Sequence, residues 1–551
     1  MQHEINKGMV SVGLPAYNRA DSLRRVLSNI TAQTYQNLEI IVSEDASPDA
    51  TVRNVIEEFA SRDHRIKYFR QDQNKGVLAN ADFVLRQAHG EYFTWFSDDD
   101  WRSPEFIELL VEELEKNKNI DFAFCDYREV YEDGSRATGY PSSHFKIFKP
   151  FTSNSRLIRT ITYYWQDAAR GKPNIFYSVF RREALAALDN KKITEGFKLL
   201  NMDCLIVFSL LQKSPVSIRS EAMCTLTCGN QKHYADPESH YKQGQKNLLI
   251  KLLDLWTDNR NDRNLYIKNT NNLAEKIIIY MLFLPKILAL FSTISLKILK
   301  RSTNSYWCGQ IGNAANIFNP DLKLVESGKD VQKIQLPNVT LVAMATRNVE
   351  ETLQALNHSC RGVKYGSVKL LSHYTPYGLD KNIEFIRIDK IKSIDDWSYK
   401  IIYELNQYID TEFALLVHAD GFVVNPSSWK NEFMDYDYIG APWPLPTDNF
   451  SYRDAHGNIV RVGNSVSLRS KKLLELPIKL NMPWEPFHGY WNEDGFICTK
   501  NKHIYEAKGM KFAPLDVAKY FSHEAMIPEV KGIKPFAFHK WAGSNRNYPK
   551  F

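Results

Sequence analysis

Two stretches of the sequence begin in the same way, with a short apolar strand, a polar loop and then a helix. The first is MVSVGLPAYNRADSLRRVLSNITAQ, and the second is VTLVAMATRNVEETLQALNHS, which begins at Val339. Another buried-looking strand follows each of them, LEIIVSEDAS in the first case and SVKLLSHY in the second. Strands that alternate with helices of about 10–15 residues indicate βαβ units, in which a parallel sheet is covered on both faces. The pattern therefore predicts an α/β fold class.

Each stretch later offers an apolar strand that ends in acidic residues, EYFTWFSDDD and FALLVHADGF. The chain has 551 residues, enough for two large domains. We predict two α/β domains of related design, over residues 1–240 and 335–551. Residues 241–334 hold an apolar run between polar loops, and we predict that they form a helical connector.

Composition narrows the class of protein. The chain is 44% hydrophobic and 24% charged, which is ordinary for a buried core and excludes disorder as the main theme. A mean hydropathy of −0.39 excludes a polytopic membrane protein. The net charge is +6, and residues 276–301 alone hold five basic residues and no acid. Because the remainder is close to neutral, a nucleic-acid partner is not expected.

The cellular compartment is predicted from cysteine usage and from the N-terminus. The seven cysteines form no C-x-x-C pair, so we expect reduced thiols. The N-terminus has no apolar segment between a basic start and a cleavage site. We therefore expect a cytoplasmic protein.

The apolar run over residues 277–299 is the membrane candidate of this sequence. About 20 residues suffice to span a bilayer, but Pro285 and Lys286 lie in the middle of the run. A charge at the bilayer centre costs at least about 2.5–3.5 kcal/mol, which disfavours a true span. Peripheral contact with an anionic membrane fits better, with three basic residues near the head groups: Lys297, Lys300 and Arg301. The alternative is a helical hairpin packed between the domains, with its bend at Pro285.

Polar loops follow the first, second and fourth predicted strands of the first domain. Ligands of open α/β sheets bind beyond the carboxyl ends of the strands, where such loops converge. The loop LPAYNR opens a helix, whose N-terminal amides favour an anion. Glu44 and Asp45 end the second strand, where a carboxylate can accept hydrogen bonds from a base or a ribose. We assign both to a nucleotide-binding site, together with Lys75, which leads into another helix.

Three successive acids, Asp98, Asp99 and Asp100, end the strand EYFTWF. They are a harmless solvated turn or a cation site, and the convergence of the other loops favours the cation site. Hard cations such as Mg²⁺ or Mn²⁺ take oxygen ligands from one or two carboxylates and from substrate phosphates. Such a metal would bridge a diphosphate and stabilise it as a leaving group.

Four motifs of this domain together resemble the inverting glycosyltransferase family two, which has the GT-A fold, a relative of the Rossmann fold: LPAYNR, EDASPD, NKG-x-x-x-N and GEYFTWFSDDDWRSPE. The resemblance covers about the first 110 residues and implies a nucleotide-sugar donor. It implies that the nucleotide is lined by Pro15, Tyr17 and Arg19, and that Asp45 contacts the base. It also implies that Asp98 and Asp99 touch ribose and metal, with Asp100 beside them. Many members have Asp where Ser97 stands, so we expect Asp99 to be the metal-facing acid.

An inverting transfer needs a general base that deprotonates the acceptor hydroxyl. In the resembled family this base is an acid on a later segment, usually one that opens a helix. The segment NMDCLIVFSLLQ places Asp203 at such a position. A helix-capping role is the alternative, and we assign Asp203 as the base.

The second domain repeats this logic with different residues. Its apolar strand ends in His-Ala-Asp at Asp420, and His539 lies near the end of the chain. Asp420 and His539 could complete one octahedral metal site with diphosphate oxygens and water. Glu493 and Asp494 are flanked by tryptophans, Trp484 and Trp491. In a sugar-acceptor site, aromatic faces stack on sugar rings while a carboxylate takes the proton.

This region looks like a second GT-A module, of a little-characterised bacterial glycosyltransferase-like family. Its blocks G-N-S…L-R-S and W-N-E-D-G are similar to those of galactosyltransferase-type enzymes. The resemblance implies that the acid pair Glu493 and Asp494 serves the acceptor and that His539 binds metal. His-Ala-Asp departs from the usual D-x-D. The alternatives are that Asp420 caps a turn and His539 is a core histidine, or that the domain only binds sugar.

We therefore expect a bifunctional bacterial glycosyltransferase with two GT-A-like domains. It would transfer sugars from nucleotide-sugar donors to a saccharide or lipid-linked glycan acceptor, building a surface polysaccharide such as an O-antigen or a capsule. We expect it at the inner face of the membrane. The alternative is a single activity in the first domain, with the second as a non-catalytic carbohydrate-binding or scaffolding module.

Overall fold

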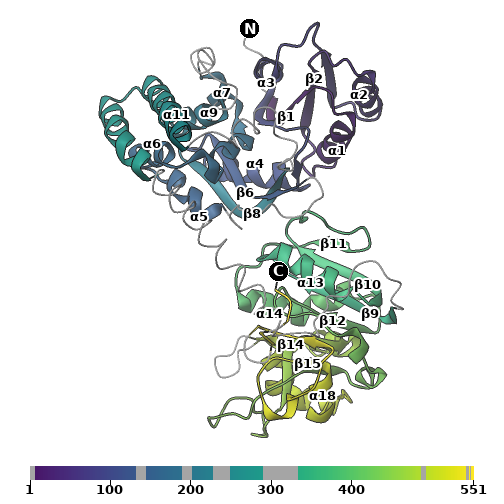
Figure 1. Ribbon diagram of the computed structural model, residues 1–551. Helices are drawn as coiled ribbons and strands as arrows, with labels where there is room; N and C mark the ends of the chain where they lie inside the picture. The colour runs from purple at the N-terminus through teal and green to yellow at the C-terminus, as the bar shows by residue number, and fades with distance from the viewer. Residues whose placement is uncertain are drawn as a thin grey trace. The chain divides into compact units, whose positions relative to one another are not determined.

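The computed structural model describes residues 6–131, 144–188, 202–227, 248–289, 333–484, 492–541, 545–546 and 548–550. The chain forms two compact units, residues 1–320 and 321–551 (Figure 1). Four residues named above lie outside the described residues: Lys297, Lys300, Arg301 and Trp491.

The first unit is built on an eight-stranded sheet in the order β3-β2-β1-β4-β7-β6-β8-β5. Its first four strands run parallel to their neighbours: β1 (Asn6–Ala16), β2 (Leu38–Glu44), β3 (Ile66–Arg70) and β4 (Gly90–Trp95). β7 (Val179–Arg181) is antiparallel to β4 and β6. The remaining strands are β5 (Trp101–Arg102), β6 (Phe122–Val130) and β8 (Val216–Thr227). The predicted α/β class is confirmed for this unit, but only β1 to β4 form the expected parallel array, and the sheet as a whole is mixed.

The helices of this sheet follow the expected apolar spacing. α1 (Ala20–Thr31) buries Leu23, Val26, Leu27 and Ile30, one stripe of a 3.6-residue period. α1 packs with α2 (Ala50–Arg62) on one face of the sheet. α3 (Val77–Arg86) returns the chain from β3 to β4 across the other face, as right-handed crossovers require. Gly13 permits this close packing, because a Cβ there would lie 2.7 Å from Val84 of α3.

The rest of the first unit is mainly helical. Its elements are α4 (Phe106–Lys116), α5 (Phe145–Phe148), η1 (Lys149–Thr152), α6 (Arg156–Trp165), η2 (Ala168–Arg170), η3 (Lys172–Tyr177), α7 (Arg182–Ala186), α9 (Met202–Leu211) and α11 (Leu248–Lys268). The aromatic rings of Tyr163, Tyr164 and Phe208 pack around Tyr266 of α11. α11 therefore belongs to the core of this unit.

A further helix, residues 273–289, follows α11 and contains the described part of the apolar run. It packs back on α11, where Arg263 lies over the rings of Tyr280 and Phe283 at 5.0 and 4.5 Å. The predicted bend at Pro285 is wrong: the helix continues through this residue, and the chain turns at residues 269–272 instead. Lys286 is buried, and its ammonium donates a hydrogen bond to the Tyr164 carbonyl at 2.7 Å. Together with the buried Ile287, Lys286 therefore holds this part of the helix against the first unit.

The opposite face of the helix over residues 273–289 is exposed and apolar. It carries Leu273, Ile277, Tyr280, Met281, Leu284 and Leu288, with exposed fractions between 47% and 72%. We call these six residues the apolar stripe. Within the part of the chain that the structure describes, no helix is both long and apolar enough to cross a membrane.

The second unit has a six-stranded sheet in the order β11-β10-β9-β12-β14-β13. The first four of these run parallel to their neighbours: β9 (Ile334–Met344), β10 (Val363–Ser372), β11 (Glu384–Arg387) and β12 (Phe413–Leu416). β14 (Val462–Ser470) is antiparallel to both β12 and β13 (Tyr438–Pro442). A separate parallel pair is formed by β15 (Ser522–His523) and β16 (Ala537–Phe538).

The helical elements of the second unit cover this sheet and carry part of the site. They are α13 (Val349–Ser359), α14 (Ile394–Tyr403), η6 (Leu405–Tyr408), η7 (Pro426–Ser428), η8 (Asn431–Asp435), α15 (Lys471–Lys479), α16 (Glu493–Gly495), η9 (Phe496–Lys500), α17 (Lys502–Ala507), α18 (Leu515–Phe521) and η10 (Pro528–Val530). One apolar cluster joins β9 and β12 to α14, and another joins β13 to α17 and the start of η9. The predicted α/β class is confirmed here too.

The two sheets have corresponding strand orders. In each, four parallel strands lie in the spatial order third, second, first, fourth, and an antiparallel strand follows the fourth. The helix after the first strand begins, in each unit, next to a non-glycine residue in left-handed backbone, Arg19 (φ 55°) and Asn348 (φ 52°). The carboxyl ends of the strands therefore present comparable sets of loops in both units.

Candidate active sites in the two units

The loops after β1 and β4 meet at the carboxyl edge of the first sheet. The Arg19 guanidinium lies 3.3 Å from an Asp98 oxygen and 3.1 Å from an Asp99 oxygen. Both carboxylates are mostly covered, with side chains 17% and 23% exposed, whereas Arg19 is half exposed. Burial and the neighbouring Asp99 raise the pKa of Asp98. The structure therefore brings Arg19, Asp98 and Asp99 together, with Arg19 as the cation between the two acids.

Backbone strain is concentrated at the same edge. Asn18, Arg19 and Ala46 all have φ between 52° and 55°, which non-glycine residues adopt rarely. The Asn18 amide donates to the Ser47 hydroxyl at 2.9 Å, which joins the loops after β1 and β2. The Asn18 side-chain oxygen is buried and has no hydrogen-bond partner among the described residues. Strained residues and an unsatisfied acceptor in one loop cluster are typical of a ligand site.

Two of the predicted nucleotide contacts are engaged within the protein. Both Asp45 oxygens accept backbone hydrogen bonds, from Lys75 at 2.8 Å and Gly76 at 2.9 Å. Asp45 therefore fixes the start of α3. The Glu44 carboxylate is buried and accepts hydrogen bonds from the Tyr68 hydroxyl and from Arg70. The Glu44 carboxylate therefore points towards β3, because both of these hydrogen-bond donors lie on that strand.

The other predicted nucleotide-lining residues lie around this edge. Pro15 is the penultimate residue of β1. Tyr17 is the first residue after this strand, and 44% of its surface is exposed. Lys75 donates its side-chain hydrogen bond to Gln71 at 2.8 Å. The structure therefore leaves Tyr17 as the accessible aromatic face beside Arg19.

Asp100, the third acid of the run, is engaged within the protein. Its carboxylate accepts a hydrogen bond from the Thr227 amide at 3.2 Å, which ties the loop to the end of β8. Burial, followed by the charge of Asp99, raises the pKa of Asp100 to about 7. In this arrangement Asp100 anchors the acid loop to β8, and its role as a metal-facing acid beside Asp99 stays a prediction.

Asp203 lies in the first turn of α9, as predicted, and is partly accessible. Its carboxylate accepts a hydrogen bond from the Cys204 amide at 2.6 Å. Burial raises the pKa of Asp203 to about 6. Tyr177, at the end of η3, is close enough to Asp100 and Asp203 for the charges of both to raise its pKa. An acid with a pKa near neutrality suits a general base.

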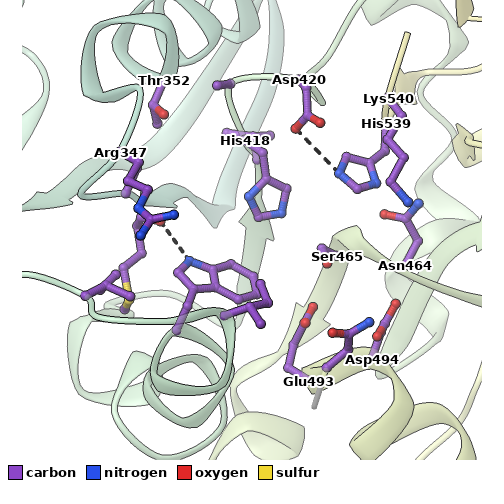
Figure 2. A pocket seen from close by; sticks show the side chains of 18 of the residues that line it. Arg347, Thr352, His418, Asp420, Asn464, Ser465, Glu493, Asp494, His539 and Lys540 are labelled. Atoms are coloured by element: carbon purple, nitrogen blue, oxygen red, sulfur yellow. Dashed lines mark hydrogen bonds and ion pairs between the residues drawn. The ribbon is translucent and has the colours of Figure 1, made fainter. Parts of the chain in front are cut away.

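The second unit encloses a cavity of about 440 Å³ at the carboxyl ends of its parallel strands (Figure 2). The ionisable side chains that line it include His418, Asp420, Asp494, Glu524, His539 and Lys540. The structure thus brings together Asp420, Asp494 and His539, which the sequence assigns to one site. Glu524 belongs to the same cavity and stands in no motif that we recognised.

His539 lies between two carboxylates. Its Nε2 is 3.6 Å from Asp420 Oδ1, the ion pair marked in Figure 2, and its Nδ1 is 3.5 Å from Glu524 Oε1. Burial lowers the pKa of His539, but the contacts with Asp420 and Glu524 outweigh burial and raise it to about 9. His539 is therefore not an isolated core histidine.

His418 is the first residue of the His-x-Asp sequence and differs from His539 in charge. Burial and the nearby His539 lower the pKa of His418 to about 3, so its ring is neutral. The His418 Nε2 atom is buried and makes no hydrogen bond to the described residues. The cavity therefore contains a neutral imidazole with one unused nitrogen.

The predicted acid pair of the second unit divides into two roles. Glu493 is buried and forms an ion pair with the buried Arg469 at 2.8 Å, so its carboxylate is engaged in the core. Asp494 accepts a hydrogen bond from the Gly495 amide at 2.8 Å. Burial, followed by the charges of Glu493 and Glu524, raises the pKa of Asp494 to about 7. Asp494 is thus the member of the pair available for proton transfer.

The aromatic wall of the cavity differs from the prediction. Trp484 donates its indole N–H to Asp395 at 2.7 Å and packs with Phe496 in a core cluster. Trp397 lines the cavity instead, and its indole N–H donates to the Met344 carbonyl at 2.9 Å. No sequence pattern marked Trp397, because it lies on a helix far from the acid pair in the chain.

The donor atoms at both edges fit a divalent cation in their chemistry. Among the described residues, no group of three or more His, Cys, Asp or Glu side chains is placed to hold a metal ion. Asp99 supplies carboxylate oxygen, which Mg²⁺ and Mn²⁺ prefer, and Arg19 neutralises it in the structure. Asp420 and His539 supply one oxygen and one nitrogen facing each other, a donor pair that suits Mn²⁺ better than Mg²⁺.

Comparison with protein families divides the chain in the same way. Residues 11–187 match the family described as Glycosyl transferase family 2. Residues 383–539 match a family described as a protein of unknown function, DUF5672.

Curated relatives match a limited part of the chain. Glycosyltransferase GlyA of Streptococcus pneumoniae is 37% identical over 123 residues, which are 22% of this chain and 17% of that protein. An uncharacterized glycosyltransferase of Haemophilus influenzae is 38% identical over 125 residues, 23% of this chain and 38% of that protein. The putative glycosyltransferase EpsH of Bacillus subtilis is 32% identical over 124 residues, 22% of this chain and 35% of that protein. The chain therefore spans well under half the length of these relatives.

Solved structures with partial similarity include TarS residues 1–349 of S. aureus. It has 20% identity and a TM-score of 0.36, and the match covers 51% of this chain and 72% of that one. The mannosyltransferase PcManGT of Pyrobaculum calidifontis, in complex with GDP-Man and Mn²⁺, has 14% identity and a TM-score of 0.35, with coverage of 56% and 83%. Residues 11–187 of the first unit are thus similar to Glycosyl transferase family 2, and the curated relatives are themselves named as glycosyltransferases.

Proposed function

We propose that the first unit transfers a sugar from a nucleotide-sugar donor to an acceptor hydroxyl, with inversion at the sugar and with Asp203 as general base. The observation that supports this proposal is Asp203, a partly accessible carboxyl in the first turn of α9 with a pKa of about 6, which has Tyr177 as a neighbour in common with Asp99 and Asp100. The similarity of residues 11–187 to family 2 supports the reaction class.

The donor would lie along the loops after β1, β2 and β4. Tyr17 and Pro15 would contact the nucleotide, Asp98 its ribose, and the Asn18 oxygen would accept a donor hydrogen bond. Arg19 would pair with the diphosphate. Asp99 would hold a divalent cation, which supplies charge neutralisation to the departing diphosphate. Asp45 and Lys75 would act indirectly, by fixing the start of α3.

The test is a screen of nucleotide sugars against defined glycan acceptors with the full chain and with Asp203→Asn. Removal of a positioned base typically costs about 10²–10⁴-fold in rate, because the proton transfer then falls to water. We expect the first linkage to drop by this factor while donor binding, measured by calorimetry, stays within about twofold. Unchanged turnover would remove Asp203 from the mechanism.

A second candidate function concerns the second unit, for which we propose a further glycosyltransferase site with the GT-A arrangement. The corresponding strand order and the cavity with Asp494, Asp420 and His539 favour it. Asp494 would be the base, and Asp420 with His539 would hold a divalent cation. The chain would then be a bifunctional enzyme of a bacterial surface polysaccharide, such as an O-antigen or a capsule. A non-catalytic, carbohydrate-binding unit is the alternative.

The apolar stripe favours a peripheral position on an anionic membrane, which would also bring the sites to a lipid-linked acceptor. Six apolar side chains are exposed along one helix, whose opposite face is fixed by buried Lys286. The only acid of this helix, Glu275, is buried and paired with Arg156. Met281→Glu with Leu284→Glu should reduce flotation with anionic vesicles at least about tenfold, since each buried side chain contributes about 1.5–3 kcal/mol. Leu445→Glu, at an exposed site of the second unit, is the control, and equal flotation of both variants would refute the contact.

A further inference from the structure

We propose that Glu524 is a positioning residue of the second site: it holds His539, Lys540 and Asn464 so that the His539 Nε2 atom faces Asp420 as a metal-binding pair. The inference rests on the proposed function of the second unit. The inference goes beyond that function by assigning a role to Glu524, which belongs to no recognised motif.

Three side chains converge on the Glu524 carboxylate. The Asn464 amide donates to Glu524 Oε2 at 2.7 Å, and the Lys540 ammonium donates to Oε1. His539 Nδ1 faces the same Oε1 atom at 3.5 Å. Asn464 belongs to β14, and His539 and Lys540 follow β16, so one carboxylate joins two separate parts of the unit.

Two residues that contact Glu524 have an unusual backbone conformation with positive φ. Asn464 has φ 103° and Lys540 has φ 59°, both in the region that side chains rarely adopt. These two strained residues are the two that donate to Glu524. Strain of this kind persists only where surrounding contacts impose it, and it clusters at functional sites. The carboxylate is therefore placed to stabilise both conformations.

Further hydrogen bonds connect Lys540 to Asp420, and Glu524 to His539 through Asn545. The Lys540 amide donates to the Asp420 carbonyl at 2.7 Å. The Asn545 side chain donates to the carbonyls of Glu524 at 2.9 Å and His539 at 2.8 Å. Glu524, His539, Lys540 and Asp420 thus hold one another through both backbone and side chains.

This geometry specifies which histidine nitrogen faces Asp420. A histidine that binds metal commonly donates its other ring N–H to a carboxylate, which fixes the tautomer and the ring orientation. Glu524 faces Nδ1, which leaves Nε2 towards Asp420 and the cavity. Loss of such an outer partner typically weakens metal affinity about 10–100-fold.

The experiment measures Mn²⁺ binding by electron paramagnetic resonance in the full chain, in an Asp99→Ala background that silences the first site. Glu524→Gln keeps the size of the side chain and removes its charge. We expect its Kd for Mn²⁺ to rise about 10–100-fold over the background. The matched control is Glu529→Gln, which removes another ion-paired glutamate of the unit, at Arg461 and outside the cavity, and should leave the Kd within about twofold.

A second variant covers a failure of Glu524→Gln to fold. Asn464→Gly accepts φ 103° without strain but lacks the hydrogen bond to Glu524, so it should fold and still bind Mn²⁺ more weakly than the background. Background affinity in Glu524→Gln, or in Asn464→Gly if the first variant does not fold, would overturn the proposal. Absence of Mn²⁺ binding in the background itself would overturn it together with the metal site. Sugar transfer by the second unit, measured separately with and without Mn²⁺, would still decide whether that unit is an enzyme.

Discussion

The two units neutralise the acids beyond their fourth parallel strand in different ways. In the first unit, Arg19 from the loop after the first strand lies between Asp98 and Asp99. In the second, His539 from near the end of the chain lies between Asp420 and Glu524. The strand order determines where the acids lie, because the carboxyl ends of parallel strands share one edge. The cation can come from any segment that reaches this edge.

The proposed bases differ in their surroundings as well. Asp203 is partly accessible in the first turn of a helix, and its pKa is raised to about 6 by burial. Asp494 lies beside the charges of Glu493 and Glu524, and burial together with these charges raises its pKa to about 7. The first unit therefore has a single proposed base, Asp203. In the second unit several carboxylates line the same cavity as the proposed base, Asp494.

The largest expected effect separates the two acids of the second unit. Glu493→Ala should lower the free energy of unfolding of this unit by about 3–5 kcal/mol, because it leaves Arg469 buried and unpaired. Asp494→Asn should leave it unchanged at low pH and raise it above pH 7, because it removes a buried acid that is costly to ionise. Urea denaturation followed by tryptophan fluorescence measures both. Equal losses would mean that the pair acts as one structural element.

A second prediction tests whether the two acid clusters work separately. Asp99→Ala should slow the first linkage by at least about 10²-fold, because the divalent cation loses its protein ligand. The second linkage, measured on a synthetic acceptor that already carries the first sugar, serves as the control and should stay unchanged. A chelator should slow wild type and leave little further effect on the first linkage of the variant. Near-normal turnover of Asp99→Ala with chelator present would contradict metal assistance in the first unit.

The smallest expected effect concerns pH. A base acts only when ionised, so each rate should fall as the pH drops through the pKa of its base, about 6 for Asp203 and about 7 for Asp494. At pH 6, the first linkage should run at about half of its maximum and the second at about one tenth. Pre-steady-state rates of the two linkages between pH 5 and 9 measure the difference. Superimposable profiles would remove this distinction between the sites.

Much of the fold could be predicted from local sequence. Apolar strands, polar loops and helices of regular spacing gave both parallel sheets and placed Asp98, Asp99 and Asp420 at the correct edges. The partners of these acids could not be predicted equally well. Glu44 is engaged by β3, and Glu524 is engaged by residues of β14 and the segment after β16. Such contacts depend on which segments the tertiary fold brings together.

The connector illustrates the same limit. The sequence identified the apolar run and its two unusual residues, Pro285 and Lys286. It did not show that Lys286 would find the Tyr164 carbonyl, which lets a helix bury one face on the first unit and expose the apolar stripe on the other. Hydropathy counts a buried lysine as a cost, whereas a local hydrogen-bond partner reduces that cost.

The central claim is that each unit carries its own active site, and product analysis of Asp494→Asn tests it most directly. With donors and a defined acceptor, mass spectrometry should show a product with one added sugar that accumulates, because loss of the second base costs about 10²–10⁴-fold while the first site still works. Asp203→Asn should do the converse and spare the second linkage on a synthetic acceptor that already carries the first sugar. If Asp494→Asn forms both linkages at wild-type rates, the second unit is not the transferase proposed here, and a carbohydrate-binding role should replace it.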